Sequence, residues 1–388
     1  MKAIIAGAGI GGLTAALCLQ RIGWQVEVIE QASQLDEVGA GIQISPNASR
    51  VLDKLGVLSH LGDQVFHPEK IEMRIGRTSR PVFSIPLRKI AVQRWGAAYL
   101  HLHRADLINA LSQTLNDKSP DSLIQGVAVQ SYTSTEEGVR VKLSDGSQRS
   151  ADLLVGADGI HSVVRKQMLG DDAPRFTGNA AWRATVPVDR LGEHVPPPTA
   201  CIWTGRGRHA VTYLLRGGTV ANFVGVIERS DWQSESWTQQ GSREEALADF
   251  ADWHPVITTI IEQTDSHYRW ALYDRAPLKQ WTDGRVVLLG DACHPMLPFL
   301  AQGAAMAIED GWVLADQLQN QTNTVEALTR YAQIRQPRTA RVQNESRANM
   351  KRFHMFDTAY APLKLAARLK PDALHARQDW LYGHDVTI

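Results

Sequence analysis

Three glycines near the amino terminus have the spacing of a nucleotide-binding turn. Gly7, Gly9 and Gly12 form the pattern G-x-G-x-x-G, which directly follows the apolar run AIIAG. The first glycine permits the tight turn, the second lets the backbone approach a pyrophosphate, and the third lets helix and strand pack closely. Glu30 ends the next apolar run, QVEVIE, where a carboxylate hydrogen-bonds ribose hydroxyls and repels a 2′-phosphate. These residues predict a bound dinucleotide and leave FAD and NAD as alternatives.

Two aspartates follow later apolar runs that are predicted to be buried strands. Asp158 follows LLVGA, and Asp291 follows VVLLG. Because ligands of open α/β sheets gather at the carboxyl ends of strands, Asp291 is placed to bind a ribitol or ribose hydroxyl. A long helix is expected to begin near Gly303, and its amino terminus would direct N–H groups at developing negative charge.

A histidine and a tyrosine form a second candidate site. His209 and Tyr213 lie four residues apart in RHAVTYLL, so in a strand their side chains point to the same face. An imidazole with an unperturbed pKa of about 6.5 suits proton transfer near neutral pH. The alternative for His209 is a hydrogen-bonded histidine of the sheet without a role in chemistry.

The elements that position these residues are of two kinds. The apolar runs of the first kind are followed by helical patterns, which is typical of a parallel Rossmann-type sheet. Between 179 and 278, short β-branched and aromatic runs separated by turn residues predict an antiparallel sheet, which the runs in 71–100 would join. The chain after about residue 340 is helical and basic, without evident chemistry. We interpret Glu309 and Asp310 as charges on an exposed helix face.

The composition excludes several classes of protein. The 388 residues are 44% hydrophobic, and the 41 Lys and Arg balance the 41 Asp and Glu, so no overall field attracts nucleic acid or an anionic membrane. No apolar stretch approaches the roughly 18 residues of a membrane helix, and no signal peptide is recognised. The three cysteines are isolated, with no metal-type spacing. We expect a cytoplasmic protein with no metal, no nucleic-acid partner and no integral membrane contact.

The order and spacing of the motifs resemble the single-component FAD-dependent aromatic hydroxylases, which have the p-hydroxybenzoate hydroxylase fold. The resemblance covers nearly the whole chain and is nearest to the salicylate, 3-hydroxybenzoate and 6-hydroxynicotinate hydroxylases. It rests on the glycine motif, on GAGIQISPNASRVL and HRADL, on Asp158-Gly159 with Ser162 and Arg165, and on GDACHP with AQG.

The resemblance implies an α/β protein: a Rossmann-type FAD-binding domain with an inserted antiparallel-sheet substrate domain and a C-terminal helical segment. The FAD-binding domain would be discontinuous and the substrate domain would consist of two segments. The expected limits are 1–70, 101–178 and 279–345 for FAD binding, 71–100 and 179–278 for the substrate domain, and 346–388 for the helical segment. That last segment would close the fold or make an oligomer contact, which allows a homodimer.

The resemblance also assigns roles around FAD. Gln43 would lie near the flavin, the stretch from Pro298 to Gly303 would face the isoalloxazine, and Asp158 would contact both FAD and the nicotinamide cofactor. Glu30 would hold the adenosine ribose, and Arg104 would hold the pyrophosphate. The main chain of Val129 would hold the adenine region, and Asp291 would hold the ribitol.

On the substrate side, the resemblance implies that His209 contacts the ring hydroxyl and helps to deprotonate it. It also implies that Tyr213 orients the ring or its acid group. Cys201 matches a pocket cysteine of the hydroxynicotinate enzymes, with a small buried thiol as the alternative. Phe299 stands where these enzymes have a polar residue, and Gln43 replaces a histidine of the hydroxynicotinate type. These differences predict a more apolar ring pocket.

The implied activity is that of a monooxygenase. It would use NADH or NADPH and O₂ to hydroxylate a small aromatic substrate, a phenolic or pyridine acid, through a C4a-hydroperoxyflavin. One alternative is the same flavin chemistry on a larger substrate, such as a quinone precursor, a polyketide or an antibiotic. Another is a flavin-binding sensor without turnover. Four arginines are candidates to anchor a substrate carboxylate: Arg183, Arg206, Arg208 and Arg216.

Overall fold

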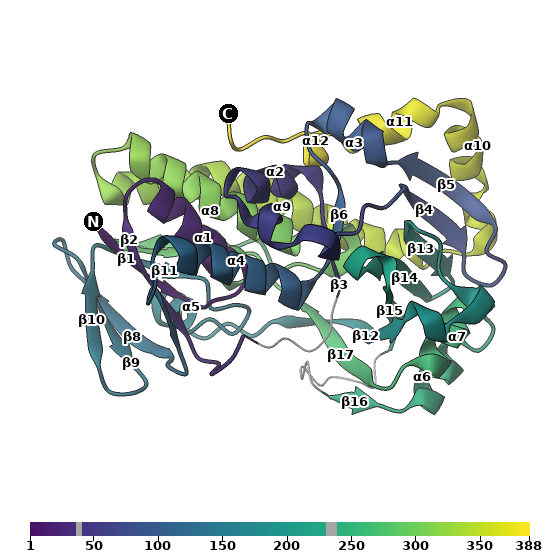
Figure 1. The fold of residues 1–388 in the computed structure, drawn as a ribbon, viewed down its shortest axis with the longest axis horizontal. Coiled ribbons are helices and arrows are strands. Elements are labelled where there is room, and N and C mark those ends of the chain that lie inside the picture. Colours follow the sequence, from purple (N-terminus) through teal and green to yellow (C-terminus); the bar gives the residue numbers. More distant parts are fainter. Residues whose placement is uncertain (36–40, 230–238) are drawn as a thin grey trace.

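The computed structural model describes residues 1–35, 41–229 and 239–388 of the chain. The motif GAGIQISPNASRVL begins at Gly39. Its first two residues, Gly39 and Ala40, lie outside the described residues, and the description resumes at Gly41. Figure 1 shows an elongated molecule with a small parallel sheet and its helices at one end and a large sheet at the other.

A parallel sheet forms the end that contains the amino terminus. In the described parts of the chain it has six strands in the order β18-β19-β11-β1-β2-β7, all parallel except the edge strand β18. This confirms the predicted Rossmann-type arrangement. The strands are β1 (Lys2–Ala6), β2 (Gln25–Glu30), β7 (Leu123–Gln125), β11 (Leu153–Gly156), β18 (Thr282–Asp283) and β19 (Val286–Leu288).

Helices and a small antiparallel sheet surround this parallel sheet. Helix α1 follows the glycine turn and packs against α4 and α8, burying Leu13, Leu17 and Cys18 as its apolar pattern predicts. Helix α5 contacts β11 and β8. The bounds are α1 (Ile10–Arg21), α4 (Arg104–Lys118), α5 (Val163–Leu169), α8 (Gly303–Asn320) and α9 (Thr324–Phe353), with β8 (Val129–Ser134), β9 (Val139–Leu143) and β10 (Gln148–Ala151) in the small sheet.

The large sheet takes its strands from the two segments that the sequence predicts. Its order among the described residues is β16-β17-β12-β15-β14-β13-β4-β5, and every pair is antiparallel except β13 with β4, which is parallel. The predicted antiparallel sheet is therefore found, with one parallel pair where the two segments meet. The strands are β4 (Lys70–Ile75), β5 (Pro81–Pro86), β12 (Arg175–Pro187), β13 (Ala200–Gly205), β14 (Arg208–Leu215), β15 (Val220–Glu228), β16 (Gln240–Gly241) and β17 (His267–Asp274).

One face of the large sheet packs against two helices, α6 (Arg243–Phe250) and α7 (Pro255–Gln263). The two helices are separate, because the chain breaks before Pro255. A capping box between Ser242 and Glu245 begins α6, and the His254 side chain accepts the Val256 N–H to begin α7. The other face of the sheet, which carries Met73 and Val226, faces the rest of the molecule.

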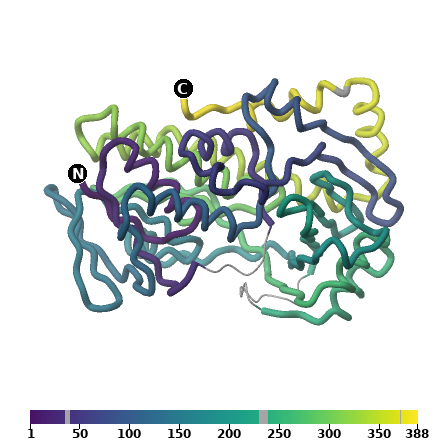
Figure 2. Tube along the Cα trace, in the orientation of Figure 1, coloured from purple at the N-terminus to yellow at the C-terminus, as the bar shows by residue number. Residues whose placement is uncertain are grey.

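The remaining elements join the two ends. Figure 2 shows the C-terminal segment returning over the large sheet, where α10 and α11 contact β5. The predicted limit at 345/346 falls inside α9, which is a single helix of 30 residues. No helix in the described stretches is long and apolar enough to cross a bilayer. The connecting elements are β3 (Gly41–Ile44), α2 (Pro46–Lys54), α3 (Arg88–Trp95), β6 (Leu100–His103), α10 (Ala361–Leu369), α11 (Pro371–Ala376) and α12 (Asp379–Tyr382), with β3 and β6 paired.

Candidate active site

One cavity of about 830 Å³ connects the two ends of the molecule. Gly9 and Gly303 line it at the end of the parallel sheet, which we call the cofactor end. His209 and Tyr213 line it at the large sheet, which we call the substrate end. The structure therefore brings together the glycine turn, the start of α8 and the His–Tyr pair, which lie far apart in the sequence.

The glycine turn leaves room that the protein itself does not fill. Gly7 has a φ of +98°, and a Cβ atom there would lie 2.5 Å from the Ala157 carbonyl oxygen. A Cβ at Gly12 would lie 2.0 Å from the Gly7 oxygen, so strand and helix touch. A Cβ at Gly9 would meet nothing within 4 Å, although Gly9 begins α1 and lines the cavity. Open space at a helix amino terminus fits a pyrophosphate.

Glu30 holds the glycine turn in place from the end of β2. Its carboxylate oxygens accept the Ala8 N–H at 2.7 Å and the Ala32 N–H at 2.8 Å. The carboxylate therefore lies beside the turn, where the ribose of a dinucleotide bound on α1 would be. The contact with ribose itself remains a prediction.

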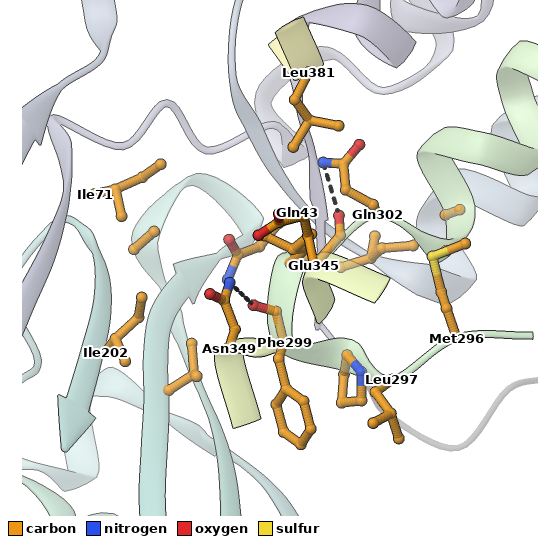
Figure 3. Close-up of a pocket in the computed structure, with 18 of the residues that line it drawn as sticks. Gln43, Ile71, Ile202, Met296, Leu297, Phe299, Gln302, Glu345, Asn349 and Leu381 are labelled. Atoms are coloured by element: carbon orange, nitrogen blue, oxygen red, sulfur yellow. Dashed lines mark hydrogen bonds between the residues drawn. The ribbon is translucent and has the colours of Figure 1, made fainter. Parts of the chain in front are cut away.

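The start of α8 forms the opposite wall of the cofactor end. A short turn at Pro298–Leu300 leads to Ala301, which has a φ of +51°, a conformation that costs energy for a residue with a side chain. Gln302 then donates its amide to the Ser45 hydroxyl at 2.8 Å and accepts the Asn47 amide at 3.2 Å. Figure 3 shows Gln302 beside the cavity. The first N–H groups of an 18-residue helix thus face the cavity.

Asp291 lies between these two walls. It follows β19 and Gly290, which has a φ of +63°, and its side chain is open to the cavity. Loss of bulk water raises the pKa of this carboxyl more than His294 and Arg104 lower it. The position at the carboxyl end of a parallel strand agrees with the expected ribitol contact, which remains a prediction.

A buried ion-pair network lies behind the start of α8. Arg335 of α9 contacts Glu309 and Asp310 of α8 at 2.6 Å each, and Arg338 contacts Glu309 at 2.7 Å. Burial alone would raise the pKa of both carboxyls, but both pKa values are lowered, because Arg335 and Arg338 outweigh burial at Glu309, and His294 and Arg335 outweigh it at Asp310. The interpretation of Glu309 and Asp310 as exposed helix-face charges is wrong, because both are fully buried.

This network reaches the cavity wall through an amide. Glu309 accepts the Asn47 amide at 2.6 Å, and Asn47 in turn contacts Gln302. Cys293, His294 and Asp310 also have ligand-type atoms within 4.8 Å of one another, the only such group among the described residues. Both oxygens of Asp310 already accept hydrogen bonds, from Arg335, His294 and the Gly290 N–H. We therefore assign this group to the ion-pair network.

The other residues predicted to bind the cofactor are placed differently. Arg104 and Gln43 line the cavity, and Gln43 accepts the Tyr99 hydroxyl at 2.7 Å. The Asp158 carboxylate instead accepts the Ser162 hydroxyl and two N–H groups at the start of α5. Val129 pairs with Leu143 in the small sheet and does not line the cavity. Neither placement by itself supports a contact with the cofactor.

The substrate end is formed by one face of the large sheet. His209 and Tyr213 both point into the cavity from β14, as their spacing predicts. The His209 ring packs edge-on against Phe299 and Phe353, with centroids 5.1 and 5.2 Å apart. Burial, with a smaller effect of His354, lowers the pKa of His209 well below its ordinary value. The imidazole is therefore neutral at neutral pH, and one of its ring nitrogens has a lone pair that can accept a hydrogen bond.

Cys201 faces away from this pocket. Its neighbours Ala200 and Ile202 line the cavity, so the alternation of β13 directs Cys201 to the opposite face. There the thiol is fully buried in the core that α6 and α7 cover, and burial raises its pKa well above the ordinary value. The placement fits the alternative of a small buried thiol.

The C-terminal part of the chain completes the pocket, which the sequence did not indicate. Glu345, Asn349 and Phe353 of α9 line the cavity, as do Trp380 and Leu381 of α12. Asn349 donates its amide to the Phe299 carbonyl at 3.1 Å, which is visible in Figure 3. The regular spacing of Glu345, Asn349 and Phe353 along one helix face is the signal that could have found this wall.

The four arginines that are candidates to bind a substrate carboxylate lie in different places in the structure. Arg183 lines the cavity, and its guanidinium lies 4.4 Å from the centre of the Trp270 ring. Arg216 is paired with Asp106 at 2.8 Å. Arg206 and Arg208 line a hollow on the outer surface instead. Of the four, Arg183 is the one that the structure places at the substrate end.

The fold and the shared cavity define a dinucleotide-binding protein whose cofactor end opens onto an aromatic pocket. Residues 1–346 match the family model described as "FAD binding domain". The chain is 37% identical over 386 residues to 3-amino-4-hydroxybenzoate 2-monooxygenase PtnB3 of Streptomyces platensis, covering 98% of this chain and 96% of that protein. It is 37% identical over 385 residues to 3-hydroxybenzoate 6-hydroxylase 1 of Aquipseudomonas alcaligenes, covering 99% and 98%.

A solved structure gives the same result. HpxO of Klebsiella pneumoniae, complexed with FAD and uric acid, has a TM-score of 0.84 and 27% identity, covering 96% of this chain and 95% of that one. The chain belongs to the FAD-binding-domain family, among its FAD-dependent aromatic hydroxylases. Of the two cofactors that the glycine motif left open, FAD is thus the dinucleotide.

Proposed function

We propose that the protein hydroxylates a small phenolic or hydroxypyridine acid, with NADH or NADPH as electron donor and O₂ as oxidant. One observation carries the proposal: His209 and Tyr213 face the same cavity as Gly9, Asp291 and the start of α8. A ring bound beside His209 is therefore in the same enclosed space as the FAD-binding walls. The named activities of the relatives on hydroxybenzoates support the choice of substrate class.

Bound FAD would supply the redox chemistry, taking a hydride from the nicotinamide and activating O₂. The protein's own part begins at the start of α8, whose N–H groups favour negative charge on the reduced cofactor. Gly9, which has open space beside it, would leave room for the pyrophosphate, Glu30 would hold the ribose, and Asp291 would hold the ribitol. Arg104 adds positive charge to the same wall.

At the substrate end, His209 accepts the proton of the ring hydroxyl. Loss of that proton raises the electron density of the ring, which an electrophilic oxygen requires. Tyr213 orients the ring from the same strand face, and Arg183 supplies a positive charge for an acid group. Phe299 and Phe353 surround the imidazole with apolar rings. The C-terminal wall lines this end of the pocket, and exclusion of water there would protect reactive species from hydrolysis.

The test is NADH and NADPH oxidation by the FAD-loaded protein with hydroxybenzoates and hydroxypyridine carboxylates, with product and hydrogen peroxide measured together. We expect at least one acid to stimulate oxidation and to yield a hydroxylated product. His209→Gln should lower kcat/KM by about 100-fold and divert oxygen to peroxide, because general base catalysis is lost. His194→Gln, at a half-exposed surface histidine, is the control. Unchanged coupling in His209→Gln would contradict the assigned role.

A further inference from the structure

Three side chains form a continuous chain from the cavity to the outer surface. The Nδ1 atom of His209 lies 2.8 Å from Nε2 of His354. The Nδ1 atom of His354 lies 2.9 Å from Oε1 of Glu228. The two imidazoles are buried, whereas the Glu228 side chain is 60% exposed. The first residue lines the cavity, and the other two line a surface hollow next to β14.

The backbone fixes the two outer residues relative to each other. Gly207, in the turn between β13 and β14, donates its N–H to the His354 carbonyl and accepts the N–H of Glu228. Gly207 has a φ of +67°, which suits glycine in this tight turn. His354 directly follows the end of α9, so the end of a long helix is attached to the turn that precedes His209. The arrangement is built into the fold and does not rest on one surface side chain.

Hydrogen bonding in this chain selects one tautomer for each imidazole. A carboxylate only accepts hydrogen bonds, so His354 carries its proton on Nδ1 and leaves Nε2 as an acceptor. His209 must then donate through Nδ1, which leaves its Nε2 unprotonated. Nε2 of His209 has no hydrogen-bond partner in the part of the chain that the structure describes. The exposed carboxylate thus determines that a lone pair is available in the cavity.

The charges around the chain favour neutral imidazoles. Burial lowers the pKa of His354 although Glu228 opposes this effect, and burial also lowers the pKa of His209. The charged groups that share the surface hollow are Arg206, Arg208, Arg229 and Asp249. On the cavity side the nearest rings are Phe299 and Phe353, which carry no charge. Two neutral imidazoles in contact can pass a proton along without holding a net charge.

We propose that His354 and Glu228 are positioning residues that connect His209 to solvent and carry the substrate's hydroxyl proton out of the closed pocket. The proposal rests on the proposed function, because it concerns the same ionisation. It names two residues, one of them in the C-terminal segment, to which the sequence motifs assign no chemical role. It provides a route for the proton that needs no water inside the cavity.

The transfer is balanced at every atom. The O–H bond of the substrate breaks and its proton binds Nε2 of His209, while the Nδ1 proton of His209 moves to Nε2 of His354. The Nδ1 proton of His354 moves to the Glu228 carboxylate, which releases it to water. The same passage in reverse returns a proton to the product's oxygen before release and restores the starting tautomers.

The first experiment needs neither substrate nor turnover. Long-range ¹H–¹⁵N spectra of the FAD-loaded, histidine-labelled protein at pH 7.5 report the tautomer of each ring, with His209→Gln and His354→Gln used for assignment. We expect both rings to be neutral with the proton on Nδ1. A proton on Nε2 of His209, or a charged His354, would overturn the proposal.

The second experiment follows the proton directly. The oxidised, FAD-loaded protein is mixed with 4-hydroxy-3-nitrobenzoate, whose ionised form absorbs visible light, and the pH is raised rapidly in a stopped-flow instrument. Glu228→Gln and His354→Gln should slow the appearance of bound phenolate about tenfold or more, with little change in the affinity for the probe. Glu193→Gln is the matched control, because Glu193 also lies beside a histidine, at 3.9 Å, but on the exposed surface.

The outcomes separate the relay from the proposed function. Equal rates in wild type, Glu228→Gln and Glu193→Gln would overturn the relay. If the probe ionises more slowly in Glu228→Gln but not in Glu193→Gln, the relay is supported. If no aromatic acid stimulates NADH or NADPH oxidation while the expected tautomers are found, the proposed function fails and the hydrogen-bonded chain stands. If the probe does not bind, the tautomers of His209 and His354 decide the matter.

Discussion

The two ends of the cavity treat ionisable side chains in opposite ways. At the cofactor end, Glu309, Asp310 and Arg335 are fully buried and keep one another charged. At the substrate end, burial lowers the pKa of His209 well below its ordinary value. His101, which packs against Tyr213, has its pKa lowered to about 3 in the same way. One end holds paired charges, and the other holds neutral imidazoles.

The difference shows what each end must do. A buried charge is tolerated only when it is paired and hydrogen-bonded, and α8 and α9 supply both partners at the cofactor end. Those pairs fix the helix start that faces the cofactor. The sheet face at the substrate end supplies mainly aliphatic and aromatic neighbours, such as Val211 and Val224. This apolar surface suits an aromatic ring and keeps the imidazole beside it neutral.

The largest effect is expected from breaking the charge pairs. Arg335→Met would leave Glu309 and Asp310 buried with too little compensation, which should lower the free energy of unfolding by about 3–5 kcal/mol. Urea unfolding of the apoprotein measures this change. Arg330→Met, at an exposed position of the same helix, should change it by less than about 0.5 kcal/mol. Equal stability of the two variants would show that the charge pairs do not hold the cofactor end.

A second substitution tests the binding of the cofactor separately from the stability of the fold. Gly9→Val places a side chain in open space next to α1, so the apoprotein should remain stable while the Kd for FAD rises about 100-fold, or about 2.7 kcal/mol. Fluorescence titration with FAD measures the Kd. Gly12→Ala is the contrasting variant, because its Cβ would overlap the Gly7 oxygen and destabilise the apoprotein itself. Normal FAD affinity in Gly9→Val would refute the pyrophosphate position.

The smallest effect tests the neutral histidines. Because the pKa of His101 is about 3 in the folded protein, only the unfolded chain binds a proton there as the pH falls below about 6.5. Its contribution to stability is therefore unchanged above pH 6.5 and declines by about 1.4 kcal/mol per pH unit below it. His101→Phe, which can keep the ring contacts with Phe66 and Tyr213, should remove this part of the decline.

Unfolding in urea at pH 8 and pH 5.5 measures the effect. Wild type should lose about 1.4 kcal/mol more than His101→Phe between these values. His161→Gln changes an exposed histidine and should behave as wild type does. An identical loss in all three proteins would mean that His101 is protonated in the folded state.

The cofactor end could be predicted because its signals are local. The glycine turn, the strand before it and Glu30 lie within 30 residues, and each has a direct backbone reason for its residue type. Asp291 and Gly303 follow from the same strand-then-helix pattern. The roles of Asp158 and Val129 did not come from such a pattern, and the structure gives these residues contacts within the protein.

The substrate end could be predicted only in part, because its contacts are distant in sequence. Strand alternation showed that His209 and Tyr213 share a face, but it could not show which face of the sheet meets the cavity. Cys201 lies on the face of the sheet that does not meet the cavity, so it does not line the pocket. The burial of Glu309 could not be foreseen either, since Arg335 and Arg338 arrive from another helix. His354 was missed for the same reason.

Helix α9 fixes the distance and the angular relation between residues at the two ends of the molecule. It carries Arg335 and Arg338 beside the cofactor end, then Asn349 on the pocket wall, and it ends just before His354. Each residue of an α-helix turns its successors by about 100° and advances them by about 1.5 Å. Inserting or deleting one residue after Arg338 would therefore move the wall and His354 out of position together. A change of chain length within this part of the helix would therefore alter the pocket wall and the position of His354 in a single step.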